Sequence, residues 1–214
     1  MNTVAFILFS SLILSQFALA ELLKRRLTFA PELSRKITHI TSSLTVCAMP
    51  FYLSKWEIAI MSVMFLVVLL LTKRFNILTG IHGVRRKTIG EFTFPIGVLL
   101  AAVALLPTDP QAFQFAFILF GLADPAAELG GGIAPIRSFD IFGQTKSLGG
   151  WLAFVVVGFL CGVSYMYYQG SPIPYQLLFV MAAILATVEL LQVYGLDNLS
   201  LPVVTGVIWL YFFP

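Results

Sequence analysis

The sequence is poor in charge and in cysteine. Lys, Arg, Asp and Glu make up 11% of its 214 residues, against roughly 25% in a typical soluble protein. The two cysteines, Cys47 and Cys161, both fall inside apolar stretches, so no disulfide framework is implied. The longest polar connection runs only from Asp124 to about Gly149. No polar stretch is therefore long enough for a separate soluble domain, and residues 1–214 are expected to form one domain.

Long apolar stretches dominate instead. The chain is 59% hydrophobic, with a mean hydropathy of +0.94, and a membrane-spanning helix needs about 20 mostly apolar residues. We therefore predict an all-α, polytopic integral membrane helix bundle with about eight transmembrane helices, or seven if one of the shorter stretches does not cross. The predicted spans are 3–20, 38–54, 56–72, 92–106, 111–129, 150–168, 173–193 and 199–213.

The basic residues predict the orientation. Twelve of the thirteen Lys and Arg fall in the first, third and fifth connections between these stretches, and loops rich in Lys and Arg stay in the cytoplasm. The net charge of +3 follows from this bias and needs no nucleic-acid partner. Ala18-Leu19-Ala20 resembles a signal-peptidase site, but the basic cluster follows the apolar run rather than preceding it. We expect a retained first span with its N-terminus outside.

The strongest candidate site follows the fifth stretch. Asp124 and Glu128 are four residues apart and share one face if the segment is helical, and carboxylates at membrane depth are usually functional. Two such groups could hold Mg²⁺ beside substrate phosphates, and Gly130–Gly132 would allow close approach of a phosphate. In the alternative interpretation, Asp124 caps a helix that starts at Pro125 and the glycines form a loop.

A second candidate is Lys146-Ser147-Leu148-Gly149-Gly150, before the sixth stretch. A Lys in a Gly-rich turn at a helix N-terminus suits a phosphate, although the spacing is not that of a P-loop. A lysine at a cytoplasmic span end is the simpler alternative.

A third candidate lies near the C-terminus. Glu189 falls inside an apolar span, which solvation does not explain, so it is a candidate general base or metal ligand. Asp197 and Asn198 close the last cytoplasmic turn, where a simple cap is the alternative.

Two basic groups complete the set. Arg35, Lys36 and His39 stand at the entrance to the second span, and Arg86 and Lys87 precede Glu91. Acids and bases from separate connections thus converge on one membrane face, which favours metal-assisted phosphoryl transfer to a lipid hydroxyl at the interface.

Taken in order, these residues resemble the polytopic, CTP-dependent lipid kinases that include dolichol kinase, phytol kinase and yeast-type diacylglycerol kinase, and they look most like the phytol kinase branch. The resembling blocks are Arg35-Lys36-x-x-His39, Arg86-Lys87-x-x-Gly90-Glu91, Ala123-Asp124-Pro125-x-x-Glu128, Lys146-Ser147-x-Gly149-Gly150, and Glu189 with Asp197-Asn198-x-x-x-Pro202.

Three departures accompany the resemblance. The family often has Gly before the aspartate where this chain has Ala123, and Glu where it has Gly149. The acidic pair that the family has before Asn is here Leu196-Asp197.

The resemblance implies transfer of the γ-phosphoryl group of a nucleoside triphosphate, with CTP as co-substrate, to an isoprenoid alcohol such as phytol, geranylgeraniol or a polyprenol. Under it, Mg²⁺ is held by Asp124, Glu128 and Asp197, and Glu189, Asp124 and Lys146 are catalytic. The nucleotide and phosphate contacts are expected from Arg35, Lys36, His39, Arg86, Lys87, Lys146, Ser147, Gly150 and Asn198.

Two other functions fit less well. A cytidylyltransferase acting on a lipid phosphate would also use CTP, Mg²⁺ and a basic cytoplasmic face. A small transporter would place its charged residues near the bilayer midplane, and of the candidates only Glu189 suits that position. The sequence does not distinguish a plasma membrane from an organelle membrane.

Overall fold

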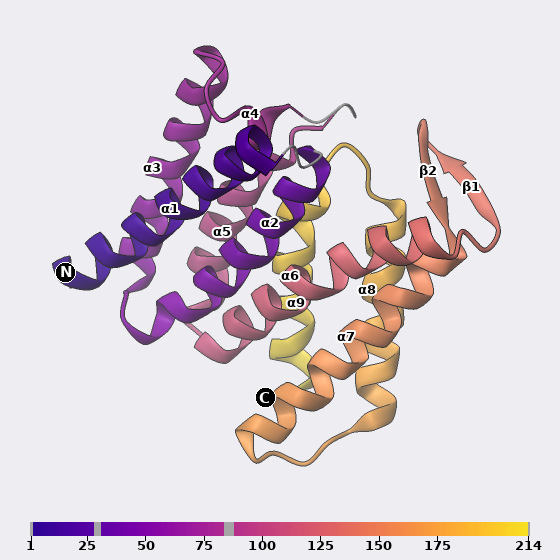
Figure 1. Ribbon diagram of the computed structural model, residues 1–214. Coiled ribbons are helices and arrows are strands. Elements are labelled where there is room, and N and C mark those ends of the chain that lie inside the picture. Colours follow the sequence, from indigo (N-terminus) through magenta and orange to yellow (C-terminus); the bar gives the residue numbers. More distant parts are fainter. Residues whose placement is uncertain (1, 28–30, 84–87, 214) are drawn as a thin grey trace.

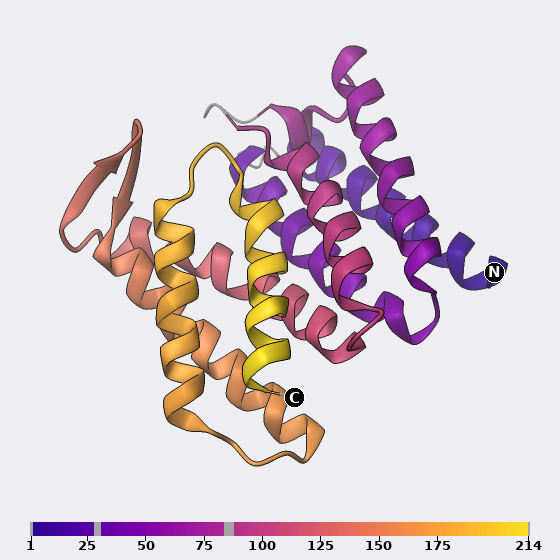
Figure 2. The same ribbon diagram turned by 180° about the vertical axis from the view of Figure 1, so that it is seen from behind.

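The fold is a bundle of eight long helices, seen in a computed structural model that describes residues 2–27, 31–83 and 88–213. Figure 1 shows the helices running alternately up and down, and Figure 2 shows the same arrangement from behind. The elements in chain order are α1 (Thr3–Leu27), α2 (Pro31–Ala48), a 3₁₀ turn (Met49–Phe51), α3 (Lys55–Arg74), α4 (Thr79–His82), α5 (Gly90–Leu105), α6 (Pro110–Ile133), β1 (Ser138–Ile141), β2 (Gln144–Ser147), α7 (Leu148–Gln169), α8 (Tyr175–Leu191) and α9 (Asp197–Phe212).

Local sequence explains where several helices begin and end. Ser54 and Glu57 form a capping box at the start of α3, in which each side chain accepts a hydrogen bond from the other residue's backbone N–H. Asp109 caps α6, with Oδ1 accepting from Gln111 N at 2.8 Å and Pro110 in the first helical position. Helix α7 ends at Gly170, which has a φ of +66°.

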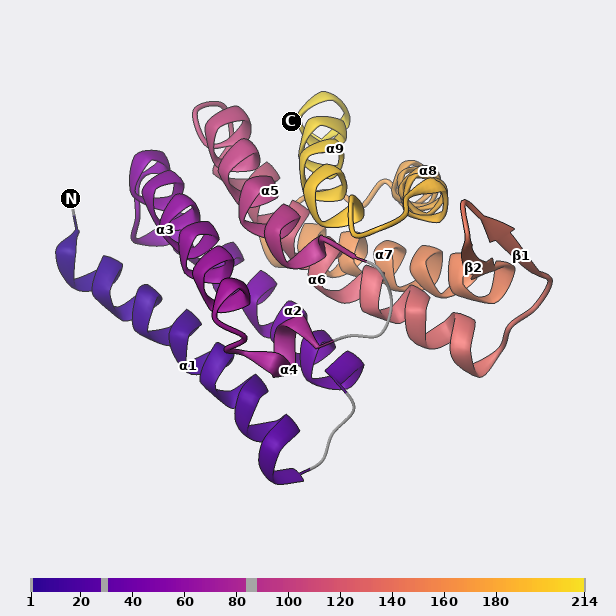
Figure 3. The ribbon, with the colours of Figure 1, turned by 90° about the horizontal axis from the view of Figure 1, so that it is seen from above.

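Helix α6 lies at the centre and packs against α2, α7 and α9. Its phenylalanines at 113, 115, 117 and 120 have no exposed surface. Because three helices pack around α6, polar side chains near its C-terminal end, such as Asp124, are surrounded by neighbouring helices. Seen from above in Figure 3, α1 and α3 lie at the opposite side of the molecule from α8 and the β-hairpin.

The outer surface is apolar. Large side chains such as Leu8 on α1 and Trp56, Ile60 and Val67 on α3 are more than 45% exposed, as expected for helices that face lipid. Among the described residues, α1, α3, α6 and α7 contain apolar segments long enough to cross a membrane, and α5 and α8 are shorter apolar helices. The chain therefore has the features of a multi-pass membrane protein, while the total of eight spans stays a prediction.

Each predicted span overlaps one of the eight long helices, but the all-helical prediction missed a feature. Strands β1 and β2 form an antiparallel hairpin between α6 and α7, with Ser138 opposite Ser147. The prediction treated this segment as an irregular connection because each strand has only four residues, too few for a recognisable alternating pattern. The hairpin positions Lys146, the last residue before the cap of α7.

Candidate active site

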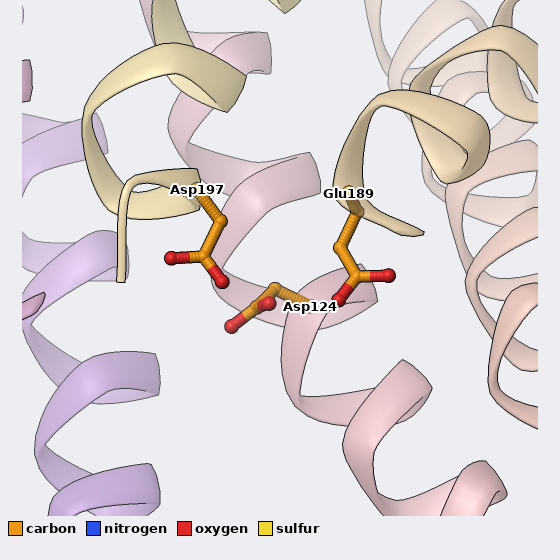
Figure 4. A group of neighbouring side chains, drawn as sticks. All are labelled: Asp124, Glu189 and Asp197. Atoms are coloured by element: carbon orange, nitrogen blue, oxygen red, sulfur yellow. The ribbon is translucent and has the colours of Figure 1, made fainter. Parts of the chain in front are cut away.

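Three carboxylates from three helices meet at one end of the bundle. Asp124 of α6, Glu189 of α8 and Asp197 of α9 each offer an oxygen, and these oxygens lie within 4.8 Å of one another. Figure 4 shows the three side chains pointing toward a common space. Like charges this close repel strongly in surroundings of low dielectric, so the group is suited to a bound cation. We call Asp124, Glu189 and Asp197 the carboxylate cluster.

The cluster depends on α6 continuing past Pro125. The helix runs unbroken to Ile133, so the interpretation of Asp124 as the cap of a new helix is wrong, as is the interpretation of Gly130–Gly132 as a loop. Asp124 and Glu128 do share a helical face, as the spacing predicted, and both line the same cavity. Glu128 is not part of the cluster: its Oε1 lies 3.5 Å from Lys36 Nζ, and its side chain is 39% exposed.

The other two members of the cluster lie on α8 and α9, on either side of the short turn that joins these helices. Glu189 stands in the last turn of α8 and is buried. Asp197 is the first residue of α9, where an acidic side chain is favoured by the helix dipole, and its Oδ1 accepts from Asn198 N at 2.9 Å. Gly195, with a φ of +86°, makes the turn between them.

Basic groups surround the cluster. Lys146 Nζ lies 2.5 Å from Glu189 Oε1, and His39 Nε2 lies 3.6 Å from Asp124 Oδ2. Lys36 reaches Glu128 further along the same wall. Two lysines and the His39 imidazole thus lie beside the carboxylates around a common space, which suits a site that holds a metal ion and anionic phosphates together.

That space is a polar cavity of about 520 Å³, within the size range of small-molecule sites. We call it the polar cavity. Eleven of the residues singled out in the sequence line it: Arg35, Lys36, His39, Asp124, Glu128, Lys146, Ser147, Gly150, Glu189, Asp197 and Asn198. Arg86 and Lys87, the remaining two candidates, lie outside the described residues.

Two N–H groups at the N-terminus of α7 have partners within the protein. Ser147 caps the helix, and its Oγ accepts from Gly150 N at 3.2 Å. Leu148 N donates to Ile136 O at 2.9 Å. These N–H groups already have partners, so the side chain of Lys146 is the better placed phosphate ligand.

The glycines at this end allow α6 and α7 to pack closely. A Cβ on Gly149 would lie 1.8 Å from Ala134 O, and one on Gly150 would lie 2.7 Å from Ala127 O. Their first role is therefore helix packing against α6, which holds Ser147 and Lys146 beside Asp124.

Arg35 and Asn198, which line the polar cavity, are anchored where α5 meets α9. Asn198 Nδ2 donates to Gly90 O at 2.7 Å, and a Cβ on Gly90 would lie 2.2 Å from Arg35 Nη2. Glu91, which is buried, lies 2.9 Å from Lys73 Nζ and 3.9 Å from Arg35 Nη1. Both basic partners come from other helices, Lys73 from α3 and Arg35 from α2.

Sequence reasoning missed several lining residues. Thr88 joins three segments: its Oγ1 accepts from Arg35 Nη2 at 3.2 Å and Gly90 N at 3.1 Å, and it donates to Tyr194 O at 3.3 Å. Gln144 and Thr145 of β2 also line the polar cavity. No sequence signal marks them, because single polar residues next to basic runs are common.

Comparison with known proteins gives one relative of known name. The chain is similar to the phytol kinase of Synechocystis sp., with 27% identity over 194 residues that cover 88% of this chain and 83% of the relative. No family model matches the chain, and no solved structure matches it. The similarity supports the resemblance seen in the sequence motifs.

Proposed function

We propose that this chain is a membrane-embedded kinase that transfers the terminal phosphoryl group of CTP to the hydroxyl of an isoprenoid alcohol at the cytoplasmic face. The observation that carries the proposal is the carboxylate cluster, with Lys146 and His39 in contact with it, in a cavity large enough for a small ligand. The similarity to a phytol kinase over most of both chains supports a lipid alcohol as acceptor.

The cluster fits Mg²⁺ because it is made of carboxylate oxygens from three rigid helices, the hard ligands that this ion prefers. When bound, Mg²⁺ would neutralise charge on the phosphates and help to position them. Asp124, Glu189 and Asp197 are the residues that would hold it. Glu128, engaged with Lys36, is assigned to orienting that lysine instead.

The basic side chains would bind the triphosphate. Lys146 of β2 and Lys36 and Arg35 of α2 line the polar cavity from two elements, so they can contact different phosphate oxygens as charge moves during transfer. In the reaction, the alcohol oxygen bonds to the terminal phosphorus, the bond from that phosphorus to the bridging oxygen breaks, and the nucleoside diphosphate leaves.

The alcohol proton needs an acceptor, and two carboxylates are candidates. Glu189 is held by Lys146, whereas Asp124 lies beside His39, which stands on the same wall as Arg35. We assign Asp124 as the group that accepts the alcohol proton. Glu189 is assigned to positioning Lys146. Little base strength is required, because phosphoryl transfer proceeds through a loose transition state in most analyses.

The test uses purified protein in detergent with Mg²⁺, γ-labelled CTP and separate samples of phytol, geranylgeraniol, dolichol and diacylglycerol. Label is expected in an isoprenoid alcohol, and Asp124→Asn is expected to lower turnover by about 100-fold or more. Glu128→Gln is the matched control, because it removes a carboxylate from the same face of the same helix, and it should retain activity within about tenfold.

Two results would contradict the proposal. Release of pyrophosphate when lipid phosphates are supplied, without label in any alcohol, would identify a cytidylyltransferase. Folded Asp124→Asn protein that turns over at the wild-type rate would overturn the metal assignment.

A further inference from the structure

Exposed tyrosine and tryptophan side chains gather at the end of the bundle remote from the carboxylate cluster. They lie at the α2–α3 connection, the end of α7, the start of α8 and the end of α9, all on the lower side of the molecule in Figure 1. Each is at least 58% exposed, and the members are Tyr52, Trp56, Tyr167, Tyr168, Tyr175 and Tyr211. We call these six residues the aromatic belt.

The belt tyrosines differ from the other two tyrosines in their hydrogen bonding. Tyr165 OH donates to Gln111 O at 3.2 Å, and Tyr194 OH donates to Phe142 O at 3.1 Å. Within the part of the chain that the structure describes, the five belt hydroxyls make no hydrogen bond to another residue. An apolar ring that carries a polar group without a protein partner suits the boundary between lipid chains and headgroups, where Tyr and Trp are enriched.

The aromatic belt is continuous with the surface that faces lipid. On α3, Trp56 is followed by Ile60 and Val67, and on α8 Tyr175 is followed one turn later by Phe179, all of them exposed. A bilayer that covers these apolar side chains also reaches the belt. The occupant of the belt surface is therefore the headgroup region of the leaflet on that side.

Two helices give the separation between the aromatic belt and the carboxylate cluster. Fourteen residues separate Tyr175 from Glu189 on α8, and fourteen separate Asp197 from Tyr211 on α9. Each interval is about 21 Å along the helix, and any tilt of the helix shortens its projection across the membrane. The hydrocarbon layer is roughly 30 Å thick, so the cluster lies about 9 Å or more short of the opposite boundary.

Helix α3 reaches further than α8 and α9. Eighteen residues, or about 27 Å, separate Trp56 from Arg74 at the two ends of α3. By contrast, α8 continues only two residues past Glu189, and α9 begins at Asp197. The bundle thus has a recess at the carboxylate cluster, and the basic end of α3 lies nearer to the water.

We propose that the aromatic belt lies in the headgroup region of one leaflet and that the carboxylate cluster lies within the hydrocarbon thickness of the other leaflet. Charged groups are tolerated at such depth where they line a cavity inside the protein, as these three do. One consequence rests on the proposed function: the phosphates would be bound below the headgroups, so the hydroxyl of a lipid substrate would reach them without leaving its leaflet.

The first test measures depth with nitroxide labels on single cysteines, in protein whose Cys47 and Cys161 are replaced by Ala, reconstituted in dioleoylphosphatidylcholine vesicles. Three exposed positions sample α8: Tyr175→Cys in the belt, Ile184→Cys in the middle, and Leu191→Cys two residues beyond Glu189. Molecular oxygen, which concentrates in hydrocarbon, and a water-soluble nickel chelate are the two relaxing agents.

We expect the ratio of oxygen to nickel accessibility to be highest at Ile184 and intermediate at Tyr175. Arg74→Cys at the end of α3 is the control, and the ratio at Leu191 should exceed the ratio at Arg74 several-fold, because water is excluded from the hydrocarbon. Equal ratios at Leu191 and Arg74 would overturn the proposed depth. A ratio at Tyr175 as high as that at Ile184 would overturn the belt. Neither outcome depends on turnover, so each is separate from the kinase proposal.

The second test changes the thickness of the bilayer. In dierucoylphosphatidylcholine, whose chains are longer, the ratio at Tyr175 should stay constant while the ratio at Leu191 rises, because the belt stays at its boundary and the recess becomes deeper. Tyr211→Cys repeats the measurement on α9 and should behave like Tyr175→Cys. A constant ratio at Leu191 with a rising ratio at both tyrosine positions would overturn the proposal, because the opposite end would then set the position.

Discussion

Lys146 contacts Glu189 twice, although 43 residues separate them in the chain: Nζ lies 2.5 Å from Oε1 and 3.2 Å from the main-chain O. Lys146 belongs to β2 and Glu189 to the last turn of α8, so the pair joins the hairpin to a helix that supplies one member of the carboxylate cluster. Both side chains are less than 20% exposed. The pair therefore has two separable consequences, one for stability and one for phosphate binding.

The first prediction separates them. Lys146→Met should lower the free energy of unfolding by about 3–5 kcal/mol, because it leaves the Glu189 carboxylate buried without its cation, and it should also abolish most activity. The double variant Lys146→Met with Glu189→Gln should regain most of the stability, since no buried charge is left, but no activity. Thermal unfolding in detergent and turnover are measured on the same preparations. Recovery of activity in the double variant would contradict the assignment of Lys146 to the phosphates.

The second prediction concerns the metal. Asp197→Asn removes one charge from the carboxylate cluster without changing the shape of the side chain, so the Mg²⁺ concentration for half-maximal activity should rise by about tenfold or more. Turnover at saturating Mg²⁺ should fall less than in Asp124→Asn. A Mg²⁺ titration of both variants beside Glu128→Gln is the measurement. An unchanged Mg²⁺ requirement in Asp197→Asn would remove Asp197 from the proposed ligand set.

The third prediction compares two helical glycines that line or adjoin the site. Gly90→Ala should destabilise the protein by about 1–3 kcal/mol, because its Cβ would lie 2.2 Å from Arg35 Nη2 and 2.6 Å from Asn198 Nδ2. Gly132→Ala is the control: no atom lies within 4 Å of a Cβ there, so alanine should be neutral or stabilising by up to about 1 kcal/mol. Melting temperatures that move in the same direction by similar amounts would contradict the close contact at Gly90.

The fourth prediction concerns Glu91, which contacts Lys73 and Arg35 at the start of α5. Glu91→Gln keeps the shape but loses the charge, so it should cost about 1–3 kcal/mol of stability and raise the KM for CTP, because Arg35 is held less firmly. Lys73→Met tests whether Lys73 or Arg35 is the more important partner of Glu91. Because Lys73 is 47% exposed, this substitution should lower the stability less than Glu91→Gln does. The two KM values for CTP and the two melting temperatures give the comparison. A larger loss of stability in Lys73→Met would show that Arg35 is not the partner that matters.

The helices and one face of the site could be predicted from the sequence. Hydropathy located eight long helices, since apolar runs of this length leave few alternatives. The spacing of Asp124 and Glu128 placed both on one face of α6, and both line the polar cavity. Glu189 was recognisable because a carboxylate inside an apolar span has few structural explanations.

The grouping of the carboxylates could not be predicted in the same way. Glu128 has the better sequence spacing to Asp124, yet Glu189 and Asp197 lie beside it, because the choice depends on how α8 and α9 pack against α6. The hairpin was missed because four-residue strands carry too little pattern. The contact of Glu91 with Lys73 and Arg35 joins side chains from three helices, which no local pattern indicates.

The order of the helices along the chain has a consequence for biosynthesis. Asp124 lies in α6, whereas Glu189 and Asp197 lie only eight residues apart on the last two helices. A nascent chain inserted into the membrane through α7 would hold all thirteen Lys and Arg residues and one member of the carboxylate cluster. The carboxylate cluster is thus complete only once α8 and α9, which follow α6 and α7 in the chain, have been synthesised and inserted. The proposed phosphoryl transfer would begin only after that step.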